Sequence, residues 1–254
     1  MTYCVALKLD EGLVFLSDTR TNAGVDDVSR YRKMFTWEVP GERAVVMMTA
    51  GNLSITQGVM TRLTVAVAEE GAIDAPAENI LTVPDLFRLA QVTGDLMRDL
   101  VEQHGDAIEK EGASSAASII LGGQIKGQPP RLFLIYSAGN FIECGEDTPF
   151  LQIGEIKYGK PILDRTITHQ TSLDEGMRTA LVSMDSSVRS NLSVGAPFDL
   201  TVVAKDRYSL SVSRRVGEAD PTFRAVSDGW SAALSRAIKD LPRVDHWFDE
   251  RASS

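Results

Sequence analysis

Residues 2–18 read TYCVALKLDEGLVFLSD, and this stretch decides how the rest of the chain is interpreted. In TYCVALKL, large apolar side chains alternate with smaller or polar ones, which predicts a half-buried strand over residues 2–9. The DEG turn signal at 10–12 leads into a second apolar run over 13–18, so the two strands form a predicted hairpin. The first strand begins directly behind Met1, where chain ends are ordinarily loose.

The later sequence places strands and long helices in separate blocks. Further strands are predicted over 33–39, 43–51, 115–123, 130–138, 198–206 and 208–216, with a short one in GNFIECG at 139–145; helices are predicted over 52–70, 84–109, 172–192 and 220–238. The polar stretch 20–27 and the stretch 71–83 are predicted loops. Strands that follow strands favour an antiparallel α+β fold, in which two stacked sheets flanked by helices would satisfy every element.

The chain is expected to form a single domain over residues 1–254, because no internal repeat or linker divides it. The strands of 1–51 open this domain, and a helix and tail over roughly 220–254 close it.

Composition excludes several classes of function. The net charge of −9 argues against a nucleic-acid partner, because proteins that bind phosphate backbones carry clustered Lys and Arg. No apolar run approaches the ~18 residues that span a membrane, and no signal peptide is visible. Two cysteines, Cys4 and Cys144, form neither a disulfide framework nor a metal motif, which predicts a reducing compartment, the cytoplasm. The three histidines lie far apart in the sequence, which weakens a Ser-His-Asp hypothesis.

Thr2 is a candidate nucleophile. Methionine is normally trimmed before a small residue, so Thr2 would expose a hydroxyl together with a free α-amine. A hydroxyl is a weak nucleophile until a base activates it, and an N-terminal amine can be that base. The α-amino pKa lies near ~7.7–8.0, so part of the amine is neutral at cellular pH. Chance is the simpler explanation of Met-Thr taken alone.

Three further residues support Thr2. Asp18 ends the second strand, so a hairpin places it beside the start of the first. Lys33 begins the third strand, where it could be oriented by the Asp18 carboxylate and lower the effective pKa of the Thr2 hydroxyl. Gly51 ends the MTAG motif before a predicted helix, a position suited to an oxyanion-binding amide. Taken singly, these residues could equally be a turn former, a solvated lysine and a strand-to-helix turn.

With these motifs in place, SDTRTNAG, RKMF and MTAGN resemble the N-terminal nucleophile (Ntn) hydrolases of the proteasome type. Residues 1–34 and QIGEIKYGKPILDR at 152–165 look most like the bacterial Anbu group, the ancestral β-subunit. The resemblance implies a four-layer αββα sandwich, with Thr2 as nucleophile, Asp18 and Lys33 as the supporting ion pair and the Gly51 amide as oxyanion donor. It also implies self-association into rings or ring-like stacks.

The sequence departs from the family pattern at two positions. Glu155 follows Gly154 where proteasomal subunits usually have serine, and Ser190 replaces the usual aspartate of an Arg-Asp pair, while Ser193 is kept. These departures put the usual hydrogen-bond network around the N-terminal amine in doubt. Glu155 is either an exposed glutamate or a carboxylate that replaces part of the lost charge near the amine.

The prediction is therefore a threonine-type peptidase that needs no metal or organic cofactor and cleaves a peptide or protein substrate within a homo-oligomer. Two alternatives remain. One is an amidase for a specialised or isopeptide-like substrate. The other is an assembled scaffold with a vestigial site. The replacement of the usual aspartate by Ser190 is the feature that supports this alternative. The sequence specifies neither the substrate nor the subunit number, any unfoldase partner or the removal of Met1.

Overall fold

The computed structural model describes residues 2–22, 28–69, 78–245 and 247. The predictions for residues 23–27 and 71–77, for His246 and for the tail after Trp247 lie outside these ranges.

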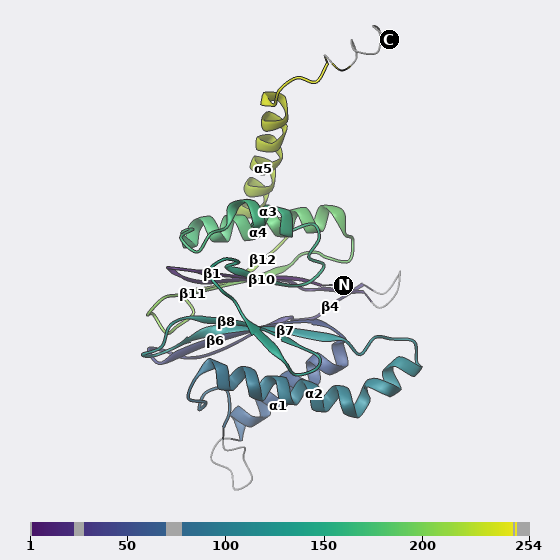
Figure 1. The fold of residues 1–254 in the computed structure, drawn as a ribbon, viewed down its shortest axis with the longest axis vertical. Coiled ribbons are helices and arrows are strands. Elements are labelled where there is room, and N and C mark those ends of the chain that lie inside the picture. Colours follow the sequence, from purple (N-terminus) through teal and green to yellow (C-terminus); the bar gives the residue numbers. More distant parts are fainter. Residues whose placement is uncertain (1, 23–27, 70–77, 246, 248–254) are drawn as a thin grey trace.

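Ten of the described strands form two antiparallel sheets (Figure 1). The first sheet contains β1 Tyr3–Leu9, β2 Gly12–Asp18, β10 Phe150–Gly154, β11 Phe198–Ala204 and β12 Val212–Val216, in the order β10-β1-β2-β11-β12. The second contains β5 Met34–Val39, β6 Arg43–Gly51, β7 Ala117–Ile125, β8 Arg131–Tyr136 and β9 Phe141–Glu143, in chain order. Within both sheets every neighbouring pair is antiparallel.

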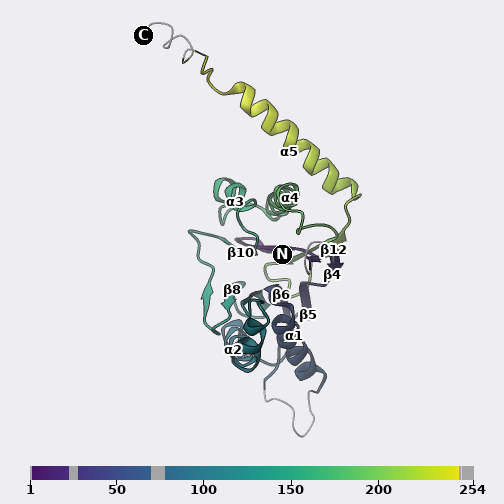
Figure 2. The same ribbon diagram turned by 90° about the vertical axis from the view of Figure 1, so that its right-hand side faces the viewer.

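Four of the described helices, α1 to α4, cover the outer faces of the two sheets, and a fifth, α5, extends away from them (Figures 1 and 2). Their bounds are α1 Leu53–Ala68, α2 Leu86–Lys110, α3 Lys160–Thr166, α4 Leu173–Ser190 and α5 Pro221–Asp240. Figure 1 shows α1 and α2 beneath the second sheet and α3 and α4 above the first. The predicted α+β fold with four αββα layers is therefore confirmed. In the part of the chain that the structure describes, no helix is both long and apolar enough to cross a membrane.

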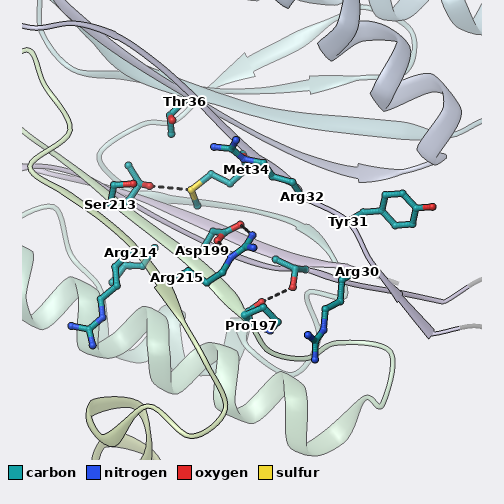
Figure 3. A pocket seen from close by; sticks show the side chains of 13 residues that line it. Arg30, Tyr31, Arg32, Met34, Thr36, Pro197, Asp199, Ser213, Arg214 and Arg215 are labelled. Atoms are coloured by element: carbon teal, nitrogen blue, oxygen red, sulfur yellow. Dashed lines mark hydrogen bonds and ion pairs between the residues drawn. The ribbon is translucent and has the colours of Figure 1, made fainter.

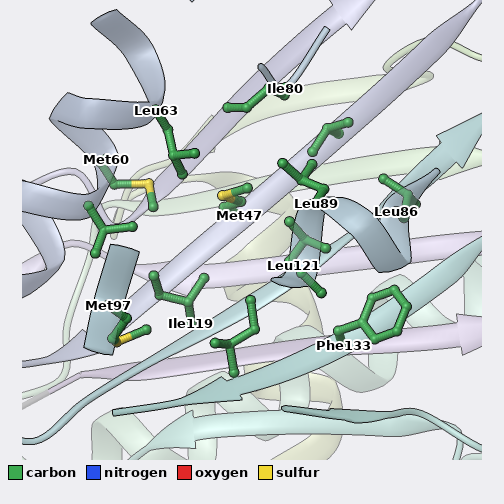
Figure 4. Close-up of a cluster of buried hydrophobic side chains, with 14 of the residues drawn as sticks. Met47, Met60, Leu63, Ile80, Leu86, Leu89, Met97, Ile119, Leu121 and Phe133 are labelled. Atoms are coloured by element: carbon green, nitrogen blue, oxygen red, sulfur yellow. The ribbon is translucent and has the colours of Figure 1, made fainter. Parts of the chain in front are cut away.

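Three apolar clusters hold the four layers together. One lies between the second sheet and α1 and α2, where Met47, Leu121 and Phe133 meet side chains of both helices (Figure 4). A second joins the first sheet to α4. The third fills the space between the two sheets and includes Cys4 and Phe15. Burial of such apolar area is the main stabilising term of the fold.

Several elements in the structure differ from those predicted from the sequence. β1 is buried on both faces rather than one, because it lies between a helix layer and the second sheet. The predicted loop over 20–27 contains β3 Arg20–Asn22, which pairs with β4 Val28–Arg30. β10 and α3 had no predicted counterpart, and β12 begins four residues later than predicted, at Val212. These features depend on hydrogen-bond pairing between segments that are far apart in the chain, and local sequence patterns do not indicate that pairing.

Candidate active site

Asp18 is the centre of a buried hydrogen-bond network at one end of β2. Its side chain is fully buried, and Oδ1 accepts from the Tyr3 amide at 3.0 Å and from Lys33 Nζ at 2.7 Å. Oδ2 accepts from the amides of Arg20 and Gly195, at 3.2 and 3.4 Å. Burial raises the pKa of Asp18 above the usual carboxyl value, and the Lys33 ammonium opposes that rise.

Lys33 reaches Asp18 from the residue before β5. Its ammonium also donates to the Arg20 carbonyl at 2.5 Å, and the residue is only 4% exposed. The Lys33 carbonyl accepts from the Thr49 amide at 2.9 Å, which joins this residue to the end of β6. The predicted solvated-lysine alternative is therefore wrong: a buried ammonium of this kind needs a paired carboxylate.

Thr2 immediately precedes the network. Its neighbour Tyr3 donates to Asp18, and its own carbonyl accepts from the Glu155 amide at 2.7 Å. Gly154 has φ +85°, and a Cβ there would collide with the Thr2 carbonyl oxygen, so only glycine fits beside Thr2. Both polar groups of the peptide bond between Thr2 and Tyr3 are thus hydrogen-bonded, which fixes the start of β1.

The Tyr3 side chain adds a second anchor to this strand. Its hydroxyl is 2.6 Å from Ser183 Oγ on α4 and accepts from Gln152 Nε2 at 2.5 Å. Cys4, the next residue, is fully buried, and burial raises the pKa of its thiol. The thiol is therefore held in its protonated, weakly nucleophilic form.

Glu155 is buried beside Thr2 rather than exposed. It is 7% exposed, and Oε2 accepts from Asn191 Nδ2 at 3.1 Å. Lys157 Nζ lies 3.6 Å from Oε1. Asn191 Oδ1 in turn accepts from the Ser193 amide at 2.9 Å, so Glu155 is connected to the loop after α4.

Ser190 lies outside this connection. It is the last residue of α4 and is exposed. The preceding Arg189 donates to Asp185 at 2.9 Å and to Ser227 on α5, away from Thr2. Asn191 was not predicted as a site residue, because its hydrogen bond to Glu155 joins segments far apart in the chain and leaves no local pattern.

Gly51 ends β6 at the corner where α1 begins. Its φ is +97°, and a Cβ would collide with the Ala116 carbonyl, so this corner requires glycine. The Asn52 amide donates to Ala116, and the Asn52 side chain caps α1 by accepting from Ser54 and Ile55. These three amides are engaged, and the Gly51 N–H remains the candidate oxyanion donor.

Hydrogen bonds between strand ends connect the segments that carry the four predicted residues. The Cys4 thiol lies 3.9 Å from the Thr49 carbonyl, which brings the start of β1 against the end of β6. Asp18 and Lys33 are joined directly. No group of three or more metal-binding side chains occurs among the described residues.

The αββα sandwich, with a buried Lys-Asp pair beside its N-terminal strand, is the architecture of proteasome-like Ntn-type peptidases, and the comparisons agree. The chain is 43% identical to an Anbu Gly-1 mutant from Hyphomicrobium sp. strain MC1, with a TM-score of 0.88 over 96% of this chain and 100% of that one. It is 41% identical to Anbu from Yersinia bercovieri, also with a TM-score of 0.88, over 96% and 98% of the two chains. The chain therefore belongs to the Anbu family, the ancestral β-subunits of proteasome-like proteins.

A third solved structure is the helical assembly of the Anbu complex from Pseudomonas aeruginosa. It is 45% identical to this chain, with a TM-score of 0.87 over 95% and 97% of the two chains. Neither a protein-family model nor a curated protein matches the sequence.

Proposed function

We propose that the chain is a threonine-type peptidase whose nucleophile is Thr2 after removal of Met1. The observation that carries the proposal is the buried Lys33–Asp18 pair, in which the same carboxylate oxygen that accepts from Lys33 also accepts from the amide next to Thr2. Such a pair holds a positive charge near the N-terminal residue in a medium of low dielectric. That charge favours the deprotonated form of a nearby hydroxyl or amine.

In the proposed reaction, the Thr2 hydroxyl oxygen attacks the substrate carbonyl carbon while the α-amine accepts the hydroxyl proton. The tetrahedral oxyanion accepts from the Gly51 amide, a contact worth about 3 kcal/mol in other enzymes. The ammonium then passes its proton to the leaving nitrogen as the C–N bond breaks, which leaves an ester on Thr2. Water, deprotonated by the same amine, attacks the ester; the acyl C–O bond breaks, the second product leaves, and the ammonium returns its proton to the Thr2 oxygen.

We assign Glu155 a positioning role beside this amine. Its buried carboxylate is held by Asn191, and its backbone holds Thr2. Through Asn191, the Ser193 amide belongs to the same chain of hydrogen bonds. Ser190 is given no part, because it is exposed at the end of α4.

The assembly is proposed to be a homo-oligomer, a ring or a ring-like stack. Figures 1 and 2 show α5 pointing away from the four layers. Only Phe223 and Ser227 of this helix are buried. Leu234 and Ile238 lie one helical turn apart on α5 and are 45% and 68% exposed, and Leu241, the residue that follows the helix, is 60% exposed; these three side chains form the exposed apolar stripe. A second copy of the chain is the occupant that we propose for this stripe, in keeping with the assembly of the Pseudomonas aeruginosa relative.

Intact mass followed by covalent labelling tests the function. The purified protein should lack the mass of methionine, and an amine- or hydroxyl-reactive peptide electrophile should label Thr2. Thr2→Ala should abolish both labelling and peptide cleavage, while Thr2→Ser should keep labelling. An initiator methionine still attached in active material, or a label on another side chain, contradicts the proposal. An unchanged Thr2→Ala activity together with intact assembly would favour the scaffold alternative.

A further inference from the structure

A second candidate site lies between the outer edges of the two sheets. It is a pocket of about 380 Å³, bordered by β5 and β12, the outermost strands of their sheets on this side (Figure 3). The pocket does not contain Thr2, Asp18 or Lys33. Three of its residues are nevertheless direct neighbours in sequence of the predicted site: Thr19 follows Asp18, and Arg32 and Met34 flank Lys33.

Four arginines surround this pocket. Arg30 ends β4, Arg32 precedes β5, and Arg214 and Arg215 belong to β12. In the view of Figure 3, Arg215 comes from β12 and Arg32 from the segment that leads into β5, and Arg30 and Arg214 lie to either side of them. This is a concentration of positive charge in a chain whose net charge is −9.

Among the described residues, acidic partners are found for the two arginines of β12. Arg215 binds Asp199 through two hydrogen bonds of 2.8 and 3.0 Å, and Arg214 binds Asp220 at 2.7 Å. Within the part of the chain that the structure describes, neither Arg30 nor Arg32 pairs with a carboxylate. Their guanidinium groups can therefore accept an anionic ligand without breaking an ion pair.

The walls of the pocket suit an extended peptide. Arg32, Met34 and Thr36 alternate along the β5 segment and so face the same side. Among the described strands, β5 and β12 each have one neighbour, so the outer backbone edge of each is open to strand addition. A peptide paired with such an edge would turn every second side chain toward the arginines.

We propose that this pocket binds an extended acidic peptide segment, whose carboxylates contact Arg30 and Arg32. The inference names a substrate class and rests on the proposed peptidase function. Arginine and carboxylate form charge-assisted, often bidentate hydrogen bonds, which gives selectivity for acidic over neutral peptides.

Binding is measured on the Thr2→Ala protein, so that no cleavage intervenes. The probe is a fluorescein-labelled peptide of alternating Glu and Val, and the matched control peptide has Gln in place of each Glu. Fluorescence anisotropy should give a Kd at least tenfold lower for the Glu peptide, roughly the effect of one charge-assisted contact. The double variant Arg30→Ser/Arg32→Ser should lose this difference. Arg236→Ser, which alters an exposed arginine on α5, should keep it.

Three outcomes would overturn the inference. Equal Kd values for the Glu and Gln peptides show that the arginines do not distinguish charged from neutral side chains. Equal competition by inorganic pyrophosphate and by the Glu peptide shows a generic anion site. A change in sedimentation of the double variant without any peptide binding shows an interface between copies. With Thr2 intact, cleavage of acidic peptides should have a lower KM; binding without any cleavage would contradict the peptidase and leave the pocket in place.

Discussion

At the scale of single residues, the Lys33–Asp18 pair makes the sharpest statement about stability. Asp18 is fully buried and Lys33 almost so, and removing one partner of such a pair leaves an uncompensated buried charge. We expect Lys33→Met to lower the free energy of unfolding by about 3–5 kcal/mol at neutral pH. Urea unfolding is the measurement.

The pH dependence of that loss follows from the raised pKa of Asp18. Without Lys33 the folded-state pKa rises further above the unfolded value of ~3.9. The destabilisation is therefore largest above the folded pKa and shrinks as the pH falls toward the unfolded pKa, because protonation removes the buried charge. Asp18→Asn combined with Lys33→Met should be more stable at neutral pH than Lys33→Met alone. A pH-independent loss, or no rescue in the double variant, would contradict this explanation.

Glu155 provides the second residue-scale prediction. In the proposed mechanism, the buried Glu155 carboxylate beside the Thr2 backbone would favour the protonated form of the α-amine. Glu155→Gln keeps a polar group for Asn191 but removes the charge. In a plot of the acylation rate against pH, we expect the acidic side of the profile to move to lower pH in this variant. Glu146→Gln, at an exposed position, should leave the profile unchanged, and an unmoved acidic side in Glu155→Gln would exclude the role.

At the scale of elements, the contact of α2 with the β8–β9 turn depends on two glycines. A Cβ on Gly94 of α2 would collide with the carbonyl oxygen of Gly139, which has φ +83°. We expect Gly94→Ala to destabilise the fold by about 1–3 kcal/mol, because the helix must shift away from the turn.

Gly229 of α5 is the matched control. It is also inside a helix, but it is exposed and a Cβ there meets no atom within 4 Å. Gly229→Ala should stabilise the helix by about 0.5–1 kcal/mol, since alanine is the better helix former. Urea unfolding of both variants compares them directly, and equal effects would show that intrinsic propensity rather than close packing governs Gly94.

At the scale of the whole molecule, the exposed stripe on α5 predicts assembly. Ile238→Glu places a charge in the centre of the apolar stripe formed by Leu234, Ile238 and Leu241. We expect sedimentation velocity to show a smaller species for this variant than for the unaltered chain. Arg236→Gln changes the net charge by the same amount on another side of the helix and should leave assembly intact. An unchanged sedimentation coefficient for Ile238→Glu would remove α5 from the interface.

The sequence alone determined most of the elements and the fold class. Alternation in TYCVALKL, the apolar run of RAVVMMTAG and the Asn52 cap are local signals, and the strands β1 and β6 and the start of α1 follow them. Asp18 could be placed near Thr2 because a hairpin with a short turn brings its two ends together. Each of these inferences needs only residues that are close in the chain.

The tertiary structure decided what lies around those residues. The four donors to Asp18 come from Tyr3, Arg20, Lys33 and Gly195, and three of them are backbone amides that carry no sequence signal. The burial of Glu155 against Asn191 and the meeting of four arginines between β5 and β12 likewise join segments far apart in the chain. The periodicity of apolar residues along the sequence indicates which face of a strand or helix a residue occupies. Which faces contact each other is determined only by the stacking of the sheets and helices.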